Sequence, residues 1–90
     1  MAGHQVHLLL GSLFIVQQNA EVLFMSGRLS RSVATDMNLG LCDVCMDANL
    51  VQMGMITLEE FIDRSNYTVN RLKCMLDDEK ISLIFGGLTL

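Results

Sequence analysis

The stretch Val6–Met25, VHLLLGSLFIVQQNAEVLFM, decides the fold because it is mostly apolar, contains no Lys or Arg and has Glu21 as its one Asp or Glu. Placed on a helix, it forms two apolar stripes. The first stripe is Val6, Leu9, Leu10, Leu13, Val16, Ala20 and Leu23, and the second is Leu8, Phe14, Ile15, Val22 and Met25. A helix that is apolar on most of its circumference must be covered on most sides. A chain of 90 residues can hardly do this alone, so we expect a second copy or a partner protein to cover it.

The composition indicates one small domain that associates with another protein. Hydrophobic residues make up 51% of the chain, and the mean hydropathy is +0.42. A short chain leaves much of this apolar surface exposed, and large exposed apolar patches usually mark interfaces. The formal net charge of −4 argues against a stand-alone, non-specific nucleic-acid binder, because phosphate neutralisation requires clustered Lys and Arg. It leaves open DNA contact through a local patch.

The apolar start of the chain does not have the features of a targeting segment, so we expect a cytoplasmic protein. The region before Leu8 lacks the positive charge of a signal peptide. A membrane-spanning helix needs about 18 consecutive apolar residues. The apolar run here is interrupted before that length by Gln17, Gln18 and Asn19, so we expect no membrane partner.

Glycines and capping residues divide the chain into predicted elements. Gly27, Gly40 and Gly54 follow apolar-periodic segments, as residues at helix C-termini do. The predicted helices are about 5–25, 31–38 with Ser30 as N-cap, 41–53, 58–64 and 68–78, with a short strand at 81–85. Short apolar runs are ambiguous, so a β interpretation of 6–16 and 21–25 stays open.

The segment 57–80 has the outline of a helix-turn-helix. Thr57 and Glu60 form a capping box, residues 65–67 form a turn, and a second helix begins at Thr68. This arrangement would expose residue types that reach base edges and phosphates, and the predicted DNA-binding residues are Thr68, Asn70, Arg71 and Lys73. Any two-helix hairpin shares the outline, so plain packing remains the alternative.

The cysteines and histidines do not complete a recognisable catalytic or metal motif. Cys42 and Cys45 have C-x-x-C spacing, but zinc needs four ligands, and Cys74, His4 and His7 supply no second pair of that kind. We interpret Cys42 and Cys45 as small core thiols. The alternatives are a redox or intersubunit role, with Cys45 or Cys74 as the candidate, and a metal site. We expect no enzyme, catalytic residue, metal, cofactor or small-molecule substrate.

Apolar and small residues between 8 and 48 form a pattern of their own. It comprises Leu8-Leu9-Leu10, Ile15-Val16-Gln17, Ala20, Phe24 and Gly27 and, after a one-residue shift, Ala34-Thr35, Leu41 and Ala48. This pattern resembles the FlhD family of flagellar transcriptional activators, over less than half of the chain. The resemblance implies an all-α homodimer wound around the first helix, and transcription activation with a second, zinc-bearing subunit. It also implies a dimer-linking cysteine, for which Cys45 or Cys74 is the candidate.

Together these patterns predict an all-α single domain over 1–90, in an intertwined homodimer. Residues 1–54 form the helical dimerisation part, and residues 55–90 form the helix-turn-helix-like hairpin and tail. The predicted dimer interface is Leu9, Leu13, Val16, Ala20 and Leu23. The predicted function is a small dimeric transcriptional regulator that acts with DNA, a partner regulatory subunit or both. The alternative is a non-enzymatic helical interaction module, such as an adaptor, inhibitor or chaperone.

Overall fold

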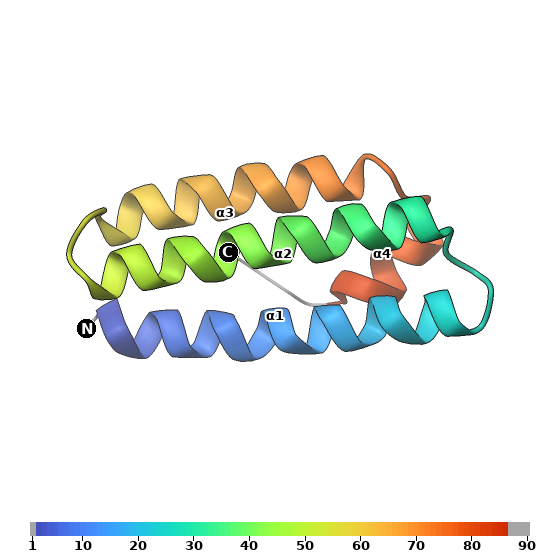
Figure 1. Ribbon diagram of the computed structural model, residues 1–90, viewed down its shortest axis with the longest axis horizontal. Helices are drawn as coiled ribbons and strands as arrows, with labels where there is room; N and C mark the ends of the chain where they lie inside the picture. The colour runs from blue at the N-terminus through green and yellow to red at the C-terminus, as the bar shows by residue number, and fades with distance from the viewer. Residues whose placement is uncertain (1, 87–90) are drawn as a thin grey trace.

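The computed structural model of the protein describes the backbone of residues 2–86 and the side chains of residues 6–86. This part of the chain is all-helical, as predicted. Its elements are α1 (Ala2–Met25), α2 (Arg31–Gln52), α3 (Leu58–Lys73) and α4 (Asp78–Phe85). Figure 1 shows three long helices lying side by side, with the short α4 at one end. The stretch 6–25 is therefore helix, which answers the question of helix or strand.

Helix α2 is the centre of the fold. It packs against α1 on one side and α3 on the other, and α4 packs against α1 (Figure 1). The largest fully buried side chains come from all four helices and include Phe61, Met37, Leu72, Ile84 and Val6. The apolar periodicity of each helix therefore converges on one core, which lies along the length of α2.

The helix starts follow from local capping chemistry. The side chain of Ser30 accepts a hydrogen bond from the Val33 amide at 3.2 Å, which confirms it as the N-cap of α2. Thr57 Oγ1 accepts from the Glu60 amide at 3.0 Å, which confirms the predicted capping interaction at the start of α3. These bonds satisfy amide groups that have no partner inside the helix.

Two of the three predicted helix ends, those at Gly27 and Gly54, also follow from local backbone conformation. Gly27 and Gly54 have φ values of 78° and 76°, a left-handed conformation that glycine adopts without steric cost. Beyond Gly27, the Arg28 amide donates to the Leu23 carbonyl at 2.8 Å, while the Gly27 amide donates to the Phe24 carbonyl at 3.0 Å. This is the Schellman arrangement, which uses carbonyl groups that the helix itself leaves free.

The predicted break at Gly40 is wrong, because α2 runs through it without interruption. Gly40 is buried, and a Cβ atom there would lie 3.0 Å from Leu72 Cδ1 and 3.2 Å from Thr68 Cγ2. Glycine at this position allows α2 and α3 to approach closely. A glycine that serves packing and one that ends a helix look alike in the sequence.

The predicted turn at 65–67 is also wrong, because 58–64 and 68–78 are joined in the single helix α3, which ends at Lys73. Ser65 and Thr68 lie on the same face as Phe61 and Leu72, and all four are buried. Their short polar side chains are typical of turns, but the spacing of the apolar residues decides the outcome. The segment therefore does not contain the turn that a helix-turn-helix requires. The buried Ser65 Oγ has no hydrogen-bond partner among the described residues.

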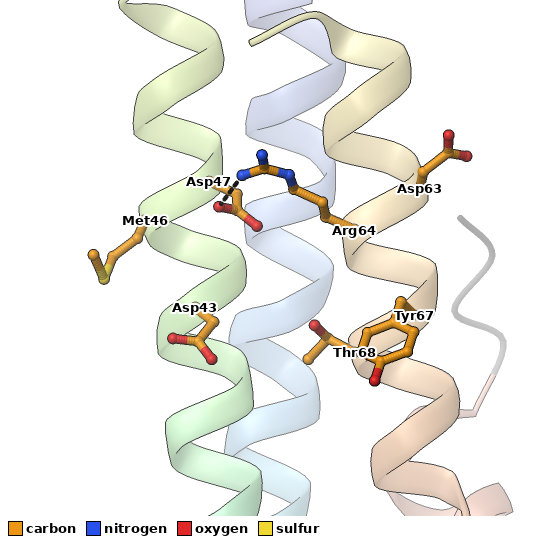
Figure 2. Close-up of a pocket in the computed structure, with 7 residues that line it drawn as sticks. All are labelled: Asp43, Met46, Asp47, Asp63, Arg64, Tyr67 and Thr68. Atoms are coloured by element: carbon orange, nitrogen blue, oxygen red, sulfur yellow. Dashed lines mark hydrogen bonds and ion pairs between the residues drawn. The ribbon is translucent and has the colours of Figure 1, made fainter. Parts of the chain in front are cut away.

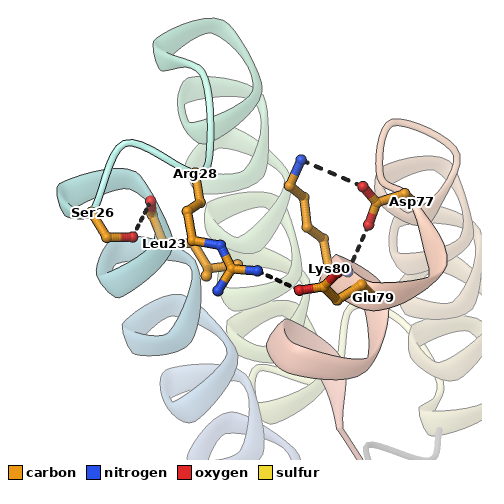
Figure 3. Close-up of polar contacts among 6 residues, drawn as sticks. All are labelled: Leu23, Ser26, Arg28, Asp77, Glu79 and Lys80. Atoms are coloured by element: carbon orange, nitrogen blue, oxygen red, sulfur yellow. Dashed lines mark hydrogen bonds and ion pairs between the residues drawn. The ribbon is translucent and has the colours of Figure 1, made fainter.

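The predicted strand at 81–85 lies in α4, which buries Ile84 and Phe85. Asp77 caps this helix by accepting from the Lys80 amide at 2.8 Å (Figure 3). The Ile84 carbonyl accepts from Asn19 Nδ2 at 3.1 Å, and this bond ties α4 to α1.

The stripe predicted as a dimer interface forms part of the core of one chain, which corrects that assignment. Leu13, Val16, Ala20 and Leu23 are buried, and the half-buried Leu9 packs against them and their neighbours. Helices α2 and α4 supply the cover that the sequence alone assigned to a second copy.

Gly40 provides a direct test of the α2–α3 contact. Alanine normally stabilises a helix interior by about 1 kcal/mol relative to glycine. We expect Gly40→Ala to lose this gain, because the added methyl group crowds buried Leu72 and overpacking of a core costs about 1–3 kcal/mol. Gly11→Ala is the matched control, since a Cβ there meets nothing within 4 Å, and it should stabilise the protein. Equal stabilisation by both changes in urea unfolding would contradict the close contact.

Candidate interaction surface

The second apolar stripe of α1 is exposed from Leu8 to Met25. Leu8, Phe14, Ile15, Val22 and Met25 are between 57% and 76% exposed. We call these five residues the outer face of α1. Leu8, Ile15 and Val22 are seven residues apart, so they form a row nearly parallel to the helix axis.

The outer face is large and almost uncharged. The exposed parts of its side chains amount to roughly 500 Å² per chain, which is at the upper end of apolar patches on soluble monomers. Between positions 6 and 25 the sequence has no Lys or Arg, and Glu21 is the one Asp or Glu. Depletion of charge around large apolar side chains is typical of the centre of a protein interface.

Helix α1 also has the dimensions of a membrane-spanning segment. By length and composition, Val6–Met25 is long and apolar enough to cross a bilayer. In its most apolar run of 18 residues, 22% is buried inside the fold. Core helices of soluble proteins meet the same requirement.

A groove runs between α1 and α2 beside the outer face. Its volume is about 260 Å³, and it is lined by Leu10, Leu13, Phe14 and Gln17 of α1 and by Asn38, Leu41, Cys42 and Cys45 of α2. The prediction that Cys42 and Cys45 are core thiols is wrong, because both residues are exposed at this groove. They lie one turn apart on the outward side of α2, while Val44 between them and Leu41 just before Cys42 face the core.

The cysteines are free, and Cys74 is exposed outside this groove. Partial burial raises the pKa of the Cys45 thiol above its usual value, and the neighbouring Cys42 raises it further. Among the described side chains, no group of three or more His, Cys, Asp and Glu residues is placed to hold a metal ion. The side chain of His4 lies outside the described residues.

A second hollow, of about 480 Å³, lies between α2 and α3 (Figure 2). Arg64 Nη1 pairs with Asp47 Oδ1 at 3.3 Å, while Asp43, Asp63 and the exposed Tyr67 stand around this pair. The hollow carries more negative than positive charge and repels phosphate. Three acidic residues, Asp43 and Asp47 of α2 and Asp63 of α3, line this hollow, which the sequence could not show because it depends on how the two helices pack.

The four predicted DNA-binding residues do not share one accessible surface. Thr68 is buried between α2 and α3, and Lys73 is half-buried with its ammonium 5.4 Å from the centre of the Phe85 ring. Asn70 and Arg71 are exposed. The helix-turn-helix spacing predicted all four as exposed, and the continuous α3 turns Thr68 toward the core instead.

Comparisons with protein families, curated proteins and solved structures give no match to this chain.

The surroundings of Cys45 predict slow alkylation. A raised pKa leaves less of the reactive thiolate at a given pH, so we expect iodoacetamide to modify Cys45 more slowly near pH 8 than an unhindered thiol, and the difference in rate to shrink as the pH rises. Peptide mass mapping gives the rate at each cysteine. Cys42→Ser should partly accelerate the alkylation of Cys45, because it removes one of the two causes of the raised pKa. An unchanged rate in this variant would show that burial alone raises the pKa.

Proposed function

We propose that this chain is a non-enzymatic helical interaction protein that self-associates through the outer face of α1. The observation that carries the proposal is the row of exposed apolar side chains on a helix whose opposite side already forms the core. Burial of such a row against another protein is strongly favourable, because it removes apolar surface from water and desolvates few charges.

A second copy of the chain fits this face. Leu8 and Val22 are each seven residues from Ile15, so an antiparallel copy centred on Ile15 places Leu8 of each chain opposite Val22 of the other. This is the self-complementarity that a two-fold dimer requires. The two copies would bury about 1,000 Å² in total, which is the lower limit for a specific interface.

The single charge of the face is compatible with this pairing. Glu21 lies six residues from Ile15, so the two Glu21 side chains of an antiparallel pair are separated by about 18 Å along the axis. That separation exceeds the screening length of about 8 Å at physiological ionic strength. Their mutual repulsion is therefore small.

The second candidate function is transcription regulation in the cytoplasm, through DNA or a partner regulatory subunit. It is supported by the exposed Asn70 and Arg71 on α3 and by the resemblance of residues 8–48 to the FlhD family. An electrophoretic mobility assay with promoter DNA at low salt, with and without candidate partner subunits, tests it. We expect a shift that Arg71→Ala weakens and Arg31→Ala preserves. Absence of a shift under both conditions would contradict this candidate.

Ile15 is the central position of the proposed interface. We expect Ile15→Asp to weaken self-association at least about 100-fold, because a carboxylate would be buried without a partner. Light scattering should report twice the 10.0 kDa chain mass for the natural sequence and the single mass for the variant. Circular dichroism should show that the helices remain, since Ile15 is 57% exposed in the fold.

Two further variants serve as controls. Leu39→Asp changes a side chain of α2 that is 60% exposed, and should leave the mass unchanged. Leu13→Asp places the charge in the core and should unfold the chain. If the natural chain is monomeric at high concentration, the proposed self-association is contradicted. Binding of the outer face to lipid vesicles would not change that conclusion.

A further inference from the structure

Cys42 and Cys45 form a pair of thiols held by one helix. They are three residues apart within α2, and both are exposed at the groove between α1 and α2. The sulfur atoms have no covalent partner. The two cysteines lie outside the outer face of α1, although Phe14 belongs to that face and also lines the groove.

The spacing of this pair disfavours a disulfide and allows a bridging ion. Side chains three residues apart on a helix have Cβ atoms about 5–6 Å from each other, whereas a disulfide requires about 3.5–4.5 Å. A disulfide would therefore distort the middle of α2. A metal ion with two metal–sulfur bonds of about 2.3 Å spans up to about 4.6 Å between sulfur atoms. Rotation about the Cα–Cβ bonds of the two cysteines can reach that separation without moving the backbone.

The ligand set selects the kind of ion. Zinc sites need four ligands, and no group of three or more candidate ligands gathers among the described side chains. Soft thiolate ligands select soft ions such as copper(I). Two thiols that each release a proton supply two negative charges, and a monovalent cation leaves the site with a net charge of −1.

The groove gives such an ion mostly apolar neighbours on one side. It is lined by Leu10, Leu13, Phe14 and Leu41 together with the polar Gln17 and Asn38, and the two cysteines are exposed in it. Apolar neighbours lower the local dielectric constant, which strengthens the attraction between a cation and thiolates. We propose that Cys42 and Cys45 bind one soft monovalent metal ion, of the copper(I) type, between their two sulfur atoms.

Titration with copper(I) tests this site on the full, reduced chain under anaerobic conditions. Copper(I) is supplied as its bicinchoninate complex, whose colour falls as the protein takes the ion. We expect one ion per chain. Cys42→Ser and Cys45→Ser should each weaken the apparent affinity by on the order of 100-fold or more, because each removes half of a chelating pair.

Cys74→Ser is the matched control, because it removes the exposed thiol that lies apart from the pair. It should leave both the stoichiometry and the affinity unchanged. Binding should also release two protons per ion, measured with a pH indicator at low buffer concentration, and circular dichroism should show α2 intact. Equal losses in all three variants, one ion per two chains, or no competition with bicinchoninate would each overturn the proposal.

Discussion

The close contact between α2 and α3 at Gly40 is the constraint on which the rest of the structure depends. Without a side chain at this position, Leu72 can lie against the backbone of α2, and α3 fits along the central helix. Helix α1 then covers the other side of α2, and α4 closes the end of the core. The inner stripe of α1 is buried as a consequence, and its outer stripe is left at the surface.

Features that depend on neighbouring residues were predictable from the sequence. Ser30 and Thr57 begin helices because their side chains satisfy amide groups within one turn, and Gly27 and Gly54 end helices because they adopt positive φ. The all-helical class follows from the periodicity of the apolar residues.

Features that depend on distant residues were not predictable. Gly40 and Ser65 have the same local signature as residues in turns, but each lies inside a long helix because another helix packs over it. For the same reason the sequence showed both stripes of α1 without revealing which one faces the chain's own core. The outer face is the candidate surface because α2 covers the other stripe.

The last helix is attached to the fold by few groups. Ile84 and Phe85 are its buried side chains, and Lys73 lies over the Phe85 ring. The hydrogen bond from Asn19 joins it to α1. The exposed ion pair between Arg28 and Glu79 joins it to the loop after α1 (Figure 3). Such a short element can open while the three long helices stay folded. Its amide hydrogens should therefore exchange with solvent before those of α2, and its opening would bare the inner side of α1 near Asn19.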